Sequence, residues 1–144
     1  MLSQDNIDKK AREIDSYLQD AASETAFSTP FDLFEPELQK KIRKAKKDGV
    51  TDIKGWLADE IYSDVNFLRD MAGDQIHDAC MSLGIKYSSK EFNLTFVRIA
   101  CSLSENKHPS LKQACKMLIG ERGVEYKNIK DDPRSTVDIL DKEF

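Results

Sequence analysis

A stripe of apolar residues recurs along residues 51–83 at helical spacing. The intervals of three and four residues place these side chains on one side of an α-helix, in which about 3.6 residues make a turn. The stripe consists of Leu57, Ile61, Val65, Leu68, Ala72, Ile76, Ala79 and Leu83. We therefore expect one long amphipathic helix, which Thr51 caps and Gly84 ends. The stripe indicates the fold class but not the function.

Four other segments carry helical signals. Capping residues, proline at a first helical position and apolar periodicity predict helices over about 3–22, 36–47 and 88–104, and from 109 to Gly120 or Gly123. The polar stretch 23–30 is expected to be a loop, and no segment alternates strongly enough to predict a strand. We expect an all-α, single-domain bundle of about five helices over 1–123. An irregular tail over 124–144 is expected to be partly flexible or to form a short helix near 135–143.

Size and composition fit a soluble globular protein. The chain has 144 residues, of which 40% are hydrophobic and 33% are charged. Its N-terminus lacks the basic and then apolar pattern of a secretory signal, and no apolar run is long enough to span a membrane. Three cysteines without CxxC spacing favour reduced, mostly buried thiols. These features predict a cytoplasmic protein, an acidic one in view of its net charge of −4.

The charge is unevenly distributed along the chain. Six of the 22 lysines and arginines lie within 40–47, which leaves 16 basic against 26 acidic residues elsewhere, a net charge of −10. The six cations are Lys40, Lys41, Arg43, Lys44, Lys46 and Lys47. On a helix over 37–47 they would cover the whole outward arc, which suits contacts with nucleic-acid phosphates. The structural alternative is a solvated face whose last-turn lysines oppose the helix dipole.

The side of the long helix opposite the apolar stripe combines acids with aromatic rings. Asp70, Asp74 and Asp78 follow one another at helical spacing, and Trp56 and Phe67 project near them. Large rings away from a core face have three readings: the helix is sandwiched between neighbours, it breaks near 63–64 and changes phase, or the rings anchor a partner. Aromatic rings surrounded by acids suit a basic amphipathic segment, so this side is our predicted partner-binding surface.

Chemical motifs are weak throughout the chain. Asp70, Asp74, His77 and Asp78 are weak candidates for metal ligands, because helical metal sites draw matching ligands from facing helices and no other helix offers them. Hydrolase, phosphate-binding and dinucleotide-binding motifs are missing from the sequence, so we expect no cofactor and no catalytic residue. The acidic and apolar C-terminus ends at Phe144, which could be captured by a partner's groove or could cover the core.

These patterns predict a non-enzymatic regulator, inhibitor or adaptor that binds another protein through the acidic and aromatic face. A homo-oligomer is also consistent with them, because the basic helix could pair with the acidic side of a second copy. The first alternative is a regulatory protein that binds nucleic acid through the basic helix. The second is a metal-dependent hydrolase that uses the acidic helix face.

Overall fold

The computed structural model describes residues 3–87, 89–105 and 108–129, and for 123–129 the backbone alone. The described residues form six α-helices and one 3-10 turn, and no strand occurs among them. The elements are α1 (Gln4–Ser28), η1 (Phe31–Leu33), α2 (Pro36–Lys47), α3 (Ile53–Tyr62), α4 (Val65–Ser82), α5 (Lys90–Ser104) and α6 (Pro109–Ile129). The all-α prediction is confirmed, with one helix more than expected.

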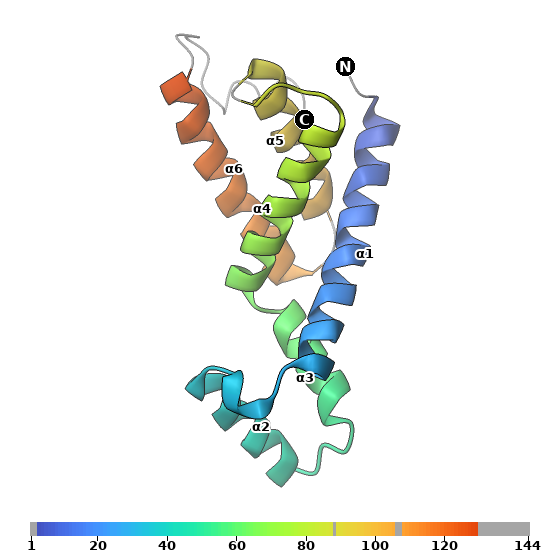
Figure 1. The fold of residues 1–144 in the computed structure, drawn as a ribbon, viewed down its shortest axis with the longest axis vertical. Coiled ribbons are helices and arrows are strands. Elements are labelled where there is room, and N and C mark those ends of the chain that lie inside the picture. Colours follow the sequence, from blue (N-terminus) through green and yellow to red (C-terminus); the bar gives the residue numbers. More distant parts are fainter. Residues whose placement is uncertain (1–2, 88, 106–107, 130–144) are drawn as a thin grey trace.

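The main core lies where the first half of α1 packs with α4, α5 and α6 (Figure 1). Its most buried side chains include Ile7, Leu18, Leu68, Ile76, Phe92, Ile99, Leu103 and Leu111. Helix α5 is buried on most of its sides, as its nearly continuous apolar sequence predicts. Helix α5 is therefore the central helix of the main core, and α1, α4 and α6 pack around it.

A second core lies at the other end of the molecule. The last turns of α1 contribute Ala22 and Ala26, which pack with Ile42 of α2 and with Leu57 and Ile61 of α3. Helix α1 extends from the main core to the second core, and α2 and α3 lie at its C-terminal end (Figure 1). The chain thus forms one bundle with two separate apolar clusters.

The long helix predicted over 51–83 is wrong in two respects. Asp52 rather than Thr51 caps its start, and the helix breaks at Ser63 and Asp64. Helix α3 ends at Tyr62, and the Asp64 carboxylate accepts hydrogen bonds from the backbone N–H groups of Asn66 (2.9 Å) and Phe67 (3.3 Å). Such a side chain satisfies the free N–H groups of a new helix, so α4 begins there. The break was one of the three readings that the off-core rings suggested.

The break divides the apolar stripe between the two cores. Leu57 and Ile61 lie in the second core, whereas Leu68, Ala72 and Ile76 lie in the main core. The last residue of the stripe, Leu83, is 38% exposed, and Cys80 is buried near the end of α4 in its place. A single stripe in sequence therefore serves two clusters in space.

Other helix ends also differ from expectation. Helix α1 continues to Ser28 through the segment expected to be a loop, because Ala22 and Ala26 are needed in the second core. Helix α6 passes Gly120 and Gly123 and ends at Ile129. Gly49 and Gly84 do follow helix ends, with φ angles of +93° and +76° that favour glycine. The expected terminal helix near 135–143 lies outside the described residues.

Within the described part of the chain, no helix combines the length and the apolar character that crossing a membrane requires.

Candidate functional site

Helix α2 presents all of its cations to solvent. Ile42 and Ala45 are only 3% and 6% exposed and hold the helix on the molecule, as the pattern predicts. The exposed side chains are Lys40, Lys41, Arg43, Lys44, Lys46 and Lys47. Three of these lie in the last turn, where positive charge also opposes the helix dipole. The basic surface is therefore present in the fold, and part of it has a structural explanation.

A groove of about 660 Å³ opens between α2, η1, the end of α1 and the end of α3. We call it the α2 groove. Its apolar lining consists of Leu33, Phe34, Leu38 and Ile61, and four carboxylates also line it: Glu35, Glu37, Glu60 and Asp64. Leu33 is 75% exposed, the largest exposed fraction among the large apolar side chains described. The groove is thus apolar within and acidic around its edge.

Lys41 also lines the α2 groove, but its single positive charge does not offset the four carboxylates of the lining. Its Nζ lies 3.9 Å from a carboxylate oxygen of Glu60, and Lys40 lies 3.8 Å from Glu37 in the next turn. Both pairs are solvent-exposed, and such pairs contribute only about 0–1 kcal/mol. A basic ligand could therefore take over these carboxylates at small cost.

The wall of the groove is held in place by Gln39. Its side-chain amide donates to the backbone carbonyl oxygens of Phe34 (2.8 Å) and Phe31 (3.3 Å). The Arg43 guanidinium lies 5.2 Å from the centre of the Phe31 ring, within the range of a cation–π contact. These contacts fix η1 against α2, so the groove exists before any ligand binds.

A second hollow, of about 320 Å³, lies on the side of α2 next to α3. We call it the Trp56 depression. Trp56 lines it together with Lys41, Lys44 and Val50, and the carboxylates of Asp48 and Glu60 also contribute. The structure therefore brings Trp56 to the cations of α2, which the helical wheel did not predict.

The predicted partner-binding residues do not form the single face that the sequence suggested. Trp56 and Phe67 are half-buried and pack against the cores, Trp56 on the second core and Phe67 on both. Asp70, Asp74 and Asp78 are exposed on α4. Because the helix breaks between them, Trp56 no longer shares a helical face with these acids. Phe144 lies outside the described residues.

The weak metal candidates are all within the described part of the chain. No three or more histidine, cysteine, aspartate or glutamate side chains there are arranged to hold a metal ion. His77 instead contacts the rings of Tyr87 and Phe92, at centroid distances of 5.6 and 5.5 Å, and its Nδ1 lies 3.7 Å from Asp78. Asp70, Asp74, His77 and Asp78 therefore do not form a metal-binding group in this fold.

The three thiols are not activated. Burial raises the pKa of Cys80 and of Cys115 to about 12, and that of the half-buried Cys101 to about 11. A thiol is a nucleophile as its thiolate, so these side chains are inert near neutral pH.

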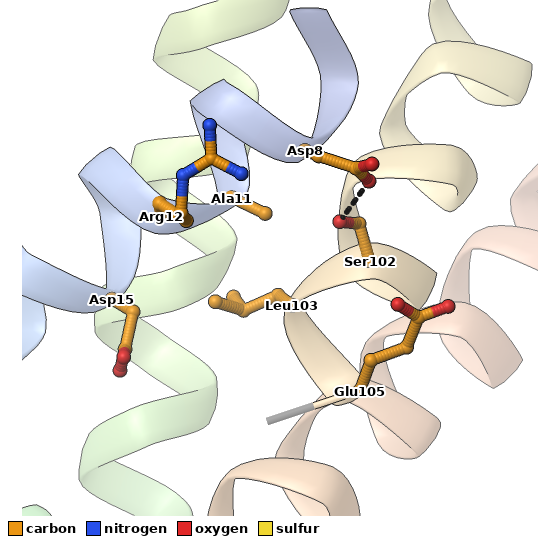
Figure 2. A pocket seen from close by; sticks show the side chains of 7 residues that line it. All are labelled: Asp8, Ala11, Arg12, Asp15, Ser102, Leu103 and Glu105. Carbon is orange, nitrogen blue, oxygen red and sulfur yellow. Dashed lines mark hydrogen bonds between the residues drawn. The ribbon is translucent and has the colours of Figure 1, made fainter. Parts of the chain in front are cut away.

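A polar pocket of about 340 Å³ lies between α1 and α5. Figure 2 shows Asp8 and Ser102 facing each other across it, with Arg12 and Asp15 further along α1. The Ser102 hydroxyl donates to the Asp8 carboxylate at 2.8 Å. This hydrogen bond is the largest cause of the lowered pKa of Asp8, followed by one from Gln4. The Asp8–Ser102 hydrogen bond joins the two helices across the pocket.

Replacing Ser102 with alanine should lower stability at neutral pH, and the loss should shrink as the pH falls below about 4. A carboxyl group whose pKa is lowered by folding stabilises the native state above its unfolded pKa, and this contribution is lost as it becomes protonated. Urea unfolding at several pH values measures the difference. Ser104→Ala is the control, because that hydroxyl donates to the carbonyl of Cys101, which does not titrate. A loss that is independent of pH in Ser102→Ala would contradict the assignment.

Leu33 is not among the site residues that the sequence patterns predict. A signal for it does exist, since Phe31, Leu33 and Phe34 stand between Pro30 and Pro36 in a segment too short to bury three large side chains.

Comparison of the chain with protein-family models, with curated proteins and with solved structures finds no match in any of the three.

Proposed function

We propose that this protein is a non-enzymatic docking protein whose α2 groove binds a basic, amphipathic segment of another protein. The observation that carries the proposal is Leu33, which is 75% exposed at an apolar groove lined by four carboxylates. The α4 acids remain exposed, but among the hollows of the described residues only one, of about 300 Å³, has an α4 acid in its lining, Asp78, and it has less than half the volume of the α2 groove. The groove is therefore the better supported contact surface.

The apolar part of the groove supplies the affinity. Leu33 contributes little to the fold, since most of its surface is in water, and Leu38 and Phe34 beside it are only half-buried. Covering a leucine side chain fully is worth about 1.5–3 kcal/mol. An apolar side chain of a partner that enters the groove would gain this contribution, which is the way in which amphipathic helices bind to grooves.

The charges around the groove supply the selectivity. Glu35 and Glu37 are exposed near the start of α2, and Glu60 and Asp64 line the groove from α3 and the α3–α4 junction. Complementary charges raise association rates, and like charges across an interface exclude wrong partners. The groove should therefore select a segment with lysines or arginines beside its apolar residues.

A defined probe tests this proposal without knowledge of the partner. A helical peptide of leucines and lysines should bind, whereas a peptide of the same pattern with glutamates in place of lysines should not. Leu33→Ala should weaken binding of the leucine–lysine peptide at least tenfold, because tenfold corresponds to about 1.4 kcal/mol and the side chain is worth more than that. Fluorescence anisotropy of the labelled peptide measures the dissociation constant.

Phe27→Ala is the matched control for this experiment. Phe27 is 61% exposed on α1 and does not line the groove, so its removal should leave peptide binding unchanged. Amide chemical shifts of the free and bound protein should change around Leu33 and Leu38. Shift changes confined to Asp70, Asp74 and Asp78, or equal binding by Leu33→Ala, would contradict the proposal. Salt-sensitive dimers in sedimentation that Leu33→Ala dissolves would show that the occupant is a second copy and would also overturn it.

A further inference from the structure

We propose that the outer face of α2, with the Trp56 depression beside it, is a binding site for single-stranded nucleic acid. In this site the lysines of α2 contact phosphates and Trp56 stacks on a base. The inference goes beyond the docking function, because it concerns the Trp56 depression and the solvent face of α2 rather than the interior of the α2 groove.

The charge of α2 provides the first support. Six exposed cations lie within eight consecutive residues, although the chain as a whole is acidic. Lys40, Lys44 and Lys47 follow one another at helical spacing and form a continuous basic line along the helix. Lysines that displace counterions from phosphates supply most of the sequence-independent affinity for nucleic acids.

The position of Trp56 provides the second and independent support. The ring is half-buried, anchored on the second core, and it lines the same hollow as Lys41 and Lys44. Proteins that bind single strands combine a basic surface with aromatic rings on which bases stack. Helix α2 itself contains no aromatic residue, and the fold brings Trp56 of α3 to its lysines.

Two carboxylates in the depression oppose an anion. Glu60 forms an exposed pair with Lys41 at 3.9 Å, which offsets only a small part of its negative charge. Asp48 follows the last residue of α2 and is exposed. Its negative charge should weaken phosphate binding, so its removal should strengthen the interaction.

The geometry favours a single strand over two other polyanions. In a duplex the base faces are stacked on one another and are not accessible to Trp56. A membrane surface would require apolar side chains that project from α2 into the bilayer. The apolar residues of α2 are instead buried or half-buried, and Trp56 lines a hollow rather than projecting.

The test uses the full chain and the fluorescence of Trp56, the only tryptophan. Addition of oligothymidylate at low salt should quench this fluorescence, which is the signature of stacking. A duplex of the same length and vesicles that contain phosphatidylserine should bind more weakly and should not quench. Absence of binding at low salt, binding without quenching, or tighter binding to the duplex or the vesicles would each overturn the proposal.

Variants distinguish the contributions of charge and stacking. Each phosphate contact in a single strand contributes about −0.7 to the slope of log affinity against log salt concentration, so Lys44→Ala with Lys47→Ala should make the slope shallower by about 1.4. Lys86→Ala with Lys90→Ala is the control pair and should leave the slope unchanged. An unchanged slope in the α2 pair would contradict the phosphate contacts.

Trp56→Leu should weaken oligothymidylate binding about tenfold, measured by anisotropy of a labelled strand, because loss of one stacking ring costs about that factor. Trp56→Phe retains an aromatic face and should restore most of the affinity. Asp48→Asn should bind the strand more tightly than the unaltered protein, a result that a merely structural role of the Trp56 ring would not predict. Circular dichroism shows whether each variant is folded. Leu33→Ala should leave strand binding unchanged, so failure of the docking proposal and failure of this one are distinguishable.

Discussion

Replacing Phe92 with alanine should lower the free energy of unfolding by about 3–5 kcal/mol, the cost typical of removing a buried aromatic ring. Phe92 is 1% exposed at the start of α5. Its ring contacts those of His77 and Tyr87 at centroid distances of 5.5 and 5.3 Å, and the Arg122 guanidinium lies 5.6 Å from its centre. The substitution would therefore leave a cavity where α4, α5 and α6 meet.

Urea unfolding followed by far-ultraviolet circular dichroism measures this loss. Phe27→Ala is the matched control, because the same chemical change is made on a helix at a side chain that is 61% exposed. Surface substitutions of this kind usually change stability by less than about 0.5 kcal/mol. Similar losses for the two variants would contradict the placement of Phe92 in the main core.

Replacing Phe67 with alanine should cost about 2 kcal/mol, less than at Phe92 because the ring is half-buried. Phe67 and Tyr62 are the two partly buried side chains that pack against both cores. The Tyr62 hydroxyl donates to Asp15 of α1, and burial, followed by this hydrogen bond, raises the pKa of Tyr62. The two rings therefore join the α3 end of the bundle to the α4 end.

Because Phe67 contacts both cores, its loss should destabilise both of them together. Trp56 fluorescence reports on the second core, and hydrogen exchange of the α5 amides reports on the main core. The free energy of unfolding obtained from each of the two probes should fall by the same amount. A Phe67→Ala variant with unchanged stability would show that the ring is free for a partner, as the sequence pattern had suggested.

The helices themselves were largely predictable, because they depend on local signals. Ser3 caps the helix expected from about residue 3, and Gly84 follows the end of α4 as expected, whereas Asp52 rather than Thr51 caps α3. Periodicity also identified Leu68, Ala72 and Ile76 as buried residues of α4, since it reveals which side of a helix is apolar. Errors occurred where tertiary packing extended a helix, as at Ala26, or where Asp64 offered a new cap inside a continuous stripe.

The candidate sites depended on contacts between distant segments. A helical wheel assigns side chains to faces only while the helix is unbroken, so the turn at Ser63 and Asp64 invalidated the grouping of Trp56 with the α4 acids. The α2 groove draws its lining from α1, η1, α2 and α3, and no spacing along the chain indicates that these segments meet.

Periodicity and capping chemistry in the sequence were sufficient to establish the all-α class, the basic helix and its buried Ile42, because these features involve neighbours only a few residues apart. The separation into two cores, the exposure of Leu33 and the position of Trp56 beside Lys44 arose from packing. Hydrophobic burial is non-directional, so the sequence shows which side chains must be covered but not which partners cover them.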